Sequence, residues 1–172
     1  METDASMLQT IIVGAINMIF TVVAISTVDK FGRKKLMMIG SAVMALCMIG
    51  LGFALYLETT GITALMFMLF YIAAFAMSWG PVVWVLLSEI FPNSIKGVMA
   101  VAVAVQWLAN LVVSWTFPMM NNNSDLVAMF NNGFPYWIYG IMAILSGLFI
   151  WKFVPETKEK TLEEMENIWI SK

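Results

Sequence analysis

Five stretches of the chain are almost continuously apolar, and short polar segments separate them. Each stretch has about the 20 residues that a helix needs to cross the hydrocarbon core of a bilayer. The stretches are rich in Gly and Ala and lack the strict alternation of a half-exposed strand, so the pattern favours helices over a β-barrel. The predicted transmembrane helices are Met7–Val28, Leu36–Leu57, Ile62–Leu87, Val98–Met119 and Phe134–Val154.

The composition agrees with a membrane protein. Of 172 residues, 61% are hydrophobic and only 12% are charged, which is too few for the surface of a soluble domain. The expected fold class is therefore an all-α, polytopic membrane protein. The single Cys47 lies inside a predicted span and excludes a disulfide framework. Without His, and without a polar cluster at ligand spacing, no metal or cofactor is expected.

The basic residues predict how the chain is oriented. All nine Lys and Arg residues lie in three places, which are Lys30–Lys35, Lys96, and the segment from Lys152 onward. The segments Tyr56–Gly61 and Met120–Gly133 contain none. With five spans, the three basic regions share one side of the membrane, and the positive-inside rule makes that side cytoplasmic. The C-terminus is therefore expected in the cytoplasm and the N-terminus outside.

An odd number of spans with an external start is typical of the back part of a longer topology. We therefore expect the chain to be part of a larger membrane protein. The alternative is a small five-span protein whose short acidic N-terminus is translocated.

Uncharged polar residues recur within the predicted spans, whereas ionisable side chains occur only near the span ends. A proton relay requires an intramembrane carboxylate or histidine, and the spans contain neither. Amide side chains donate and accept hydrogen bonds at once, which suits a neutral, hydroxylated ligand. The alternative is hydrogen bonding between helices, worth about 1 kcal/mol. The polar stripes are Ala102, Gln106, Asn110 and Ser114 on the fourth span, with Trp107 adjacent, and Thr10, Gly14, Asn17 and Thr21 on the first.

The third span contains a helix-breaking dipeptide, Gly80-Pro81. Pro81 has no N–H, so the Met77 carbonyl loses its helical partner and the helix is expected to bend. Gly80 allows close approach of a ligand or another helix. Trp84 follows one turn later on the same face, where its indole could stack on the apolar face of a sugar or act as a gate. The alternative is a tryptophan packed within a kinked helix.

Two of the predicted cytoplasmic segments combine acidic and basic residues around a turn. Asp29-Lys-Phe-Gly-Arg-Lys-Lys35 joins the first two spans, and Glu89-Ile-Phe-Pro-Asn-Ser-Ile-Lys-Gly97 follows the third. Asp29 and Arg33 are placed to pair with groups on adjacent helices. The alternative is ordinary surface charge, in which each exposed pair contributes less than about 1 kcal/mol.

Four motifs stand in order across the five spans, namely "DKFGRK", "GPVVWVLLSEIFPNSIKG", "QWLAN" and "PETKEKTLEE". The ordered set resembles the second half of a sugar porter of the major facilitator superfamily, from its eighth to its twelfth helix. The resemblance implies that residues 1–154 form part of the C-terminal transmembrane bundle and that residues 155–172 form a cytoplasmic tail.

The function implied by the resemblance is secondary active transport by alternating access. The implied substrate is a pentose or hexose, with D-xylose foremost, and the full-length protein would couple its uptake to protons. The implied partners are the sugar, the lipid bilayer and the missing N-terminal half, with no nucleic acid. The chain alone would not be a complete symporter and is not expected to be an enzyme. The alternative is a freestanding scaffold or partner-binding subunit that reuses the fold.

The resemblance also assigns residues, with two departures from the family pattern. Lys96 stands where an arginine is usual, which removes bidentate pairing with a carboxylate. Glu159 stands where the tail motif commonly has glycine. The implied sugar-binding residues are Gly80, Trp84, Gln106 and Trp107. The implied conformational latch consists of Asp29, Arg33, Glu89 and Lys96.

The last segment is expected to leave the membrane. Pro155 should end the fifth span, and Thr161-Leu-Glu-Glu164 has the pattern of a capping box that opens a short cytoplasmic helix.

Overall fold

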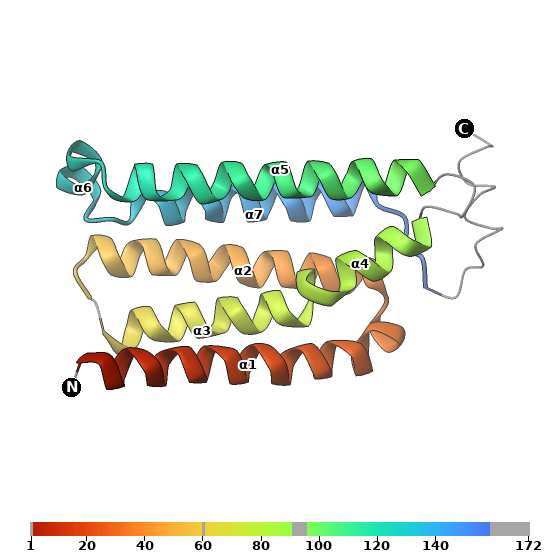
Figure 1. Cartoon of the computed structure of the whole chain (residues 1–172), viewed down its shortest axis with the longest axis horizontal. Coiled ribbons are helices and arrows are strands. Elements are labelled where there is room, and N and C mark those ends of the chain that lie inside the picture. Colours follow the sequence, from red (N-terminus) through yellow and green to blue (C-terminus); the bar gives the residue numbers. More distant parts are fainter. Residues whose placement is uncertain (1, 60, 91–95, 159–172) are drawn as a thin grey trace.

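The computed structural model describes residues 2–59, 61–90 and 96–158, with the side chains of residues 2–6 and 96 left out of the description. The longest helices lie side by side along the long axis of the molecule (Figure 1). In chain order the elements are α1 (Glu2–Phe31), α2 (Arg33–Tyr56), α3 (Ile62–Met77), α4 (Trp79–Ile90), α5 (Lys96–Asn121), α6 (Ser124–Phe130) and α7 (Phe134–Phe153).

Five helical segments of the described chain are long and apolar enough to cross a membrane, which confirms the five predicted spans. The first span was predicted to end at Val28, but α1 continues through Asp29 and Lys30 because charged side chains can extend beyond the hydrocarbon into water. Gly32 ends it, with a φ of 87° that favours glycine. The observed spans are Met7–Phe31, Arg33–Tyr56, Ile62–Ile90, Gly97–Asn121 and Phe134–Phe153.

The predicted break in the third span is confirmed, and it lies at Ser78. This residue has φ −129° and ψ −82° and separates α3 from α4. The helical hydrogen-bond pattern resumes at Val82, whose N–H donates to the Ser78 carbonyl at 3.1 Å. The break precedes Pro81 because proline disturbs the turn on its N-terminal side. Figure 1 shows α4 running at an angle to α3.

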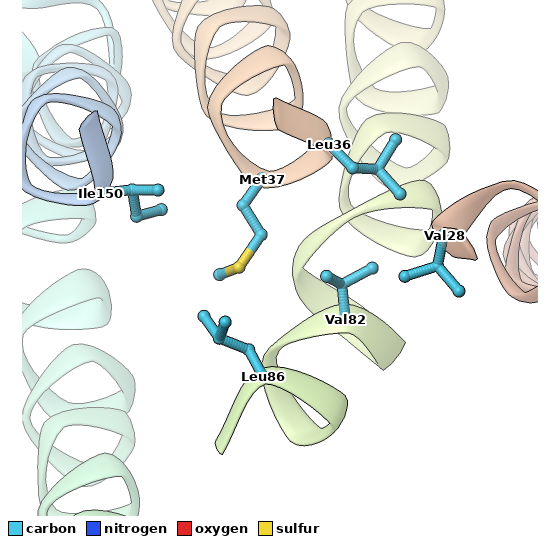
Figure 2. Close-up of a cluster of buried hydrophobic side chains, with 6 residues drawn as sticks. All are labelled: Val28, Leu36, Met37, Val82, Leu86 and Ile150. Carbon is cyan, nitrogen blue, oxygen red and sulfur yellow. The ribbon is translucent and has the colours of Figure 1, made fainter. Parts of the chain in front are cut away.

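A cluster of buried apolar side chains joins α1, α2, α4 and α7 near one end of the bundle. Figure 2 shows Met37 extending from α2 toward Leu86 of α4. The bend at Ser78 brings α4 across the end of α2, so its apolar side covers this cluster. The cluster consists of Val28, Leu36, Met37, Val82, Leu86 and Ile150.

The contact between α2 and α7 is the most extensive in the described chain. A Cβ atom added to Gly140 would lie 2.8 Å from Cγ1 of Ile49, and one added to Gly147 would lie 3.1 Å from Cβ of Ser41. Such close approach requires small residues, as is usual between membrane helices. Gly140 and Gly147 therefore serve the packing of α7 against α2.

The segment before α7 is rich in asparagine and contains the short helix α6. Asn123 caps it, because its side-chain oxygen accepts hydrogen bonds from the backbone N–H groups of Asp125 and Leu126 at 3.0 and 3.1 Å. Asn131 ends α6 in the left-handed conformation and donates from Nδ2 to the Tyr56 carbonyl at 3.0 Å. The asparagines therefore order this segment instead of loosening it.

The last span ends at Phe153, where the prediction placed its end at Val154. Val154 is extended, with φ −87° and ψ 122°, because a residue before proline avoids the helical region. Pro155 to Lys158 then leave the helix axis and return toward the start of α2. The short helix predicted at Thr161–Glu164 lies outside the described residues.

Candidate functional site

Arg33, the first residue of α2, is the centre of an ion-pair cluster beside the buried core. Its Nη2 atom lies 2.8 Å from Oε1 of Glu89 and 2.9 Å from Oδ1 of Asp29. Its Nε also donates to Oε1 of Glu89, at 3.1 Å. The Arg33 side chain is 13% exposed and that of Glu89 is 27% exposed, whereas that of Asp29 is 76% exposed. The pair with Glu89 is therefore the stronger of the two, because water screens Asp29.

The second oxygen of Glu89 binds the segment that follows α7. The Thr157 hydroxyl donates to Oε2 of Glu89 at 2.6 Å, and Thr157 is buried. Glu89 thereby joins α4 to α2 through Arg33 and to the end of α7 through Thr157. Hydrogen bonds to a charged group are roughly twice as strong as those between neutral groups. The Glu89 carboxylate is therefore the group that connects three segments at this end of the bundle.

Glu156 caps the start of α2 from 123 positions away in the sequence. Its Oε1 accepts from the backbone N–H of Arg33 at 3.0 Å, and from those of Thr157 and Lys158 at 3.2 Å. The first N–H groups of a helix have no partner inside the helix, and its positive end attracts a carboxylate. A side chain at Gly32 would place Cβ 2.7 Å from Oε2 of Glu156, so the close approach also needs glycine there.

The predicted latch residues are partly accounted for. Asp29, Arg33 and Glu89 come together as expected. Lys96 begins α5, and its side chain lies outside the described residues. Sequence reasoning missed Glu156 and Thr157, although the "PETKEKTLEE" motif that contains them was noticed. Pairing of charged residues along the sequence identifies neither residue. Thr157 is neutral, and Glu156 binds backbone N–H groups that lie close to it only in the folded chain.

Trp84 lies on the side of α4 that faces away from the core. Val82 and Leu86 are buried, and each is about 200° from Trp84 around the helix. Trp84 is 42% exposed, and Gly80 precedes it by one turn. The bend at Ser78 thus buries one face of α4 and leaves the indole on the other face uncovered by the described chain.

The side chains of Gln106 and Trp107 are exposed on α5. No residue of the membrane-spanning window of α5 is buried. The helix is fixed near its far end, where the hydroxyls of Thr116 and Tyr139 lie 3.0 Å apart and Phe117 packs edge-on against Tyr136. Within the part of the chain that the structure describes, the Gln106 amide has no hydrogen-bond partner. An amide at membrane depth needs one, so a ligand, water or a further segment has to supply it.

A cavity of about 350 Å³ lies between α2, α3, α4, α5 and α7, and Tyr71, Trp79 and Ser146 are among its lining residues. None of the four predicted sugar-binding residues lines it. Trp84, Gln106 and Trp107 are exposed on α4 and α5, whereas Gly80 is half-buried beside Phe75. Trp79 is fixed structurally, because its Nε1 donates to Oγ of Ser41 at 2.8 Å.

The family model described as "Sugar (and other) transporter" matches residues 1–169. The D-xylose-proton symporter of Escherichia coli (strain K12) is 68% identical over 169 residues, which cover 98% of this chain and 34% of the symporter. The glucose facilitated diffusion protein of Zymomonas mobilis subsp. mobilis is 47% identical over 169 residues, which cover 98% of this chain and 36% of that protein.

A solved structure gives the same result for the fold. The proton:xylose symporter of the major facilitator superfamily bound to 6-bromo-6-deoxy-D-glucose superposes with a TM-score of 0.89 at 68% identity. The match covers 97% of this chain and 35% of the symporter chain. The chain thus spans about a third of the length of these relatives, and almost all of the chain is aligned with them. On the family match, the identity and the shared helical bundle, the chain belongs to the sugar (and other) transporter family.

Proposed function

We propose that this chain forms part of the C-terminal half of a secondary active sugar transporter and that its substrate is D-xylose. The observation that carries the proposal is that α4 exposes an indole and α5 exposes an unpartnered amide, both at membrane depth. Indoles stack on the apolar faces of sugars, and amides match hydroxyl groups that both donate and accept. The high identity to a D-xylose-proton symporter supports this sugar as the substrate.

The sugar site of this proposal has two parts in the chain. Trp84 stacks on the sugar, and Gly80 leaves room for it one turn earlier. Gln106 hydrogen-bonds its hydroxyls, and Trp107 provides a second aromatic surface. The remaining contacts come from helices that the relatives have and this chain does not span.

Proton coupling belongs to the transporter as a whole and not to this segment. The predicted spans contain no carboxylate or histidine at mid-depth that could carry a proton. A facilitated diffusion protein and a proton symporter both match almost the whole chain. The segment is therefore compatible with either mode of transport, and we assign the coupling carboxylate to the other half.

The ion-pair cluster acts as a conformational latch in this proposal. The buried core at this end packs α1, α2, α4 and α7 against one another, and the ion-pair cluster ties the ends of these helices together. The Arg33–Glu89 pair and the Glu156 cap fix these ends. Lys96 is the remaining proposed member. Opening of the cytoplasmic side would require this cluster to be rearranged.

A chimera tests the function directly. Residues 1–169 replace the matching segment of the E. coli D-xylose-proton symporter, and cells that lack their own xylose uptake express the product. We expect accumulation of radiolabelled D-xylose that a protonophore abolishes. A chimera that reaches the membrane with the parent's thermal stability but neither binds nor transports D-xylose would refute the proposed function.

The proposal includes an orientation, with Lys172 in the cytoplasm and the α6 segment outside. Asn123→Cys and Lys158→Cys are introduced singly into a background that carries Cys47→Ala. We expect an impermeant thiol reagent to label position 123 in intact cells, and to label position 158 only after the cells are opened, because every basic segment should face the cytoplasm. The reverse labelling pattern would overturn the orientation.

A further inference from the structure

An apolar groove runs along the contact between α2 and α7 and has a volume of about 630 Å³. Small residues such as Ala42, Ala45 and Gly147 form part of its lining, and the bulkier Leu46 and Leu148 line it as well. The volume falls within the range of roughly 300–1,000 Å³ that is typical of ligand pockets. The groove is large enough for a ligand, and its lining excludes a polar one.

The groove faces away from the interior of the bundle. Leu46 and Ile144 line it, whereas Met44 and Met142 line the cavity between α2, α3, α4, α5 and α7. On each helix the two positions are about 200° apart, so they lie on opposite sides. The groove therefore opens on the other side of the α2–α7 pair from that cavity, and its occupant comes from the surrounding membrane.

One end of the groove lies among lysines. Lys34 and Lys35 precede Met38 by one turn of α2, and Lys152 directly follows Trp151 of α7. None of these lysines pairs with a carboxylate of the described chain, because the acidic groups there are held around Arg33. Lys152 Nζ lies 5.4 Å from the centroid of the Phe153 ring. The groove thus combines an apolar channel with lysines at its end that pair with no carboxylate of the described residues.

The length of the groove matches one leaflet of a bilayer. From Met38 to Ile49, at about 1.5 Å per helical residue, it extends about 16 Å along α2. The hydrocarbon core of a bilayer is about 30 Å thick, so the groove reaches from the charged end to about the midplane. Trp151 lies at the charged end, where tryptophan is enriched at membrane–water interfaces.

We propose that this groove binds an anionic phospholipid. One acyl chain lies in the apolar channel, and the headgroup phosphate binds Lys34, Lys35 and Lys152. Basic pockets between transmembrane helices are known to hold anionic headgroups, and the interaction depends on both the charge and the chain. This site is separate from the sugar face and from the Arg33 cluster, and it does not depend on the proposed function.

The test measures lipid binding to the purified 172-residue chain by native mass spectrometry. The probes are phosphatidylglycerol and phosphatidylcholine with identical acyl chains, and glycerol 3-phosphate as a headgroup without chains. We expect preferential binding of phosphatidylglycerol and no competition from glycerol 3-phosphate. Lys34→Gln with Lys35→Gln should weaken phosphatidylglycerol binding by about thirtyfold. Lys30→Gln with Lys96→Gln removes the same charge from α1 and α5, which do not line the groove, and should leave binding unchanged.

A second variant tests the channel itself. Ala42→Trp fills the groove and leaves every lysine in place, so it should also weaken phosphatidylglycerol binding. Circular dichroism of the variant checks that it keeps the helicity of the parent. Equal loss of binding in the two lysine double variants would show non-specific charge attraction and overturn the proposal. Undiminished binding in a folded Ala42→Trp chain would overturn it as well.

Discussion

Alanine at Gln106 or Trp84 should weaken D-xylose binding to the chimera by up to about thirtyfold, as measured by isothermal titration calorimetry. Loss of one hydrogen bond to a sugar hydroxyl costs on the order of 1–2 kcal/mol, and each 1.4 kcal/mol changes affinity tenfold. Loss of the indole removes an aromatic surface of comparable energy. Both side chains are exposed on faces that the described chain leaves open, so their removal should not disturb the core.

Two matched variants control for the loss of the same chemical group elsewhere. Trp151→Ala removes an exposed indole from α7, which carries none of the proposed sugar-binding residues, and Gln9→Ala removes an exposed amide near the start of α1. Neither should change D-xylose affinity by more than about twofold. If Gln106→Ala binds the sugar as tightly as its parent, the amide stripe serves helix packing and the sugar face is assigned wrongly.

Arg33→Ala should shift the chimera toward the state that is open to the cytoplasm by about thirtyfold. Breaking an exposed ion pair costs less than about 1 kcal/mol and breaking a buried one costs about 3–5 kcal/mol. The side chains of Arg33 and Glu89 are partly buried, so the cost of breaking their pair should lie between these limits. We expect the closed state to lose about 2 kcal/mol of stability relative to the open state. The readout is the labelling rate of Ser88→Cys, an exposed position one residue before Glu89. Labelling should become faster when the cluster is broken.

The conservative variant separates charge from geometry. Arg33→Lys keeps the charge but lacks the planar guanidinium group that donates to both Glu89 and Asp29. Its labelling rate at position 88 should therefore lie between those of the parent and of Arg33→Ala. Lys30→Ala removes a charge from the same end without touching Glu89 and should leave the rate unchanged. If Arg33→Ala labels at the parental rate, the cluster stabilises the fold but does not latch it.

The sequence predicted those features that depend on local pattern. The five spans follow from the apolar runs, and the break before Pro81 follows from its missing N–H. The grouping of Asp29, Arg33 and Glu89 was expected from the resemblance to the sugar porters and not from local pattern. The helix α6 was missed because its signal, the capping by Asn123, lies within an Asn-rich segment that has the composition of a loop.

Features that depend on contacts between distant segments could not be predicted in this way. Glu156 caps α2 only because α7 ends beside the start of α2, and no local pattern encodes that arrangement. The groove between α2 and α7 likewise depends on how closely Gly140 and Gly147 let the two helices approach. The sugar-binding residues remain a prediction, since Trp84 and Gln106 face outward from the described chain.

The proposed function makes the sugar face and the latch separate parts of this chain. Equilibrium D-xylose affinity of the chimera, measured for Gln106→Ala and Glu89→Ala in the same detergent, tests it most directly. We predict that Gln106→Ala loses affinity by up to about thirtyfold. Glu89→Ala should retain affinity within about threefold and should instead change the labelling rate at position 88. Full affinity in Gln106→Ala together with lost affinity in Glu89→Ala would contradict the account.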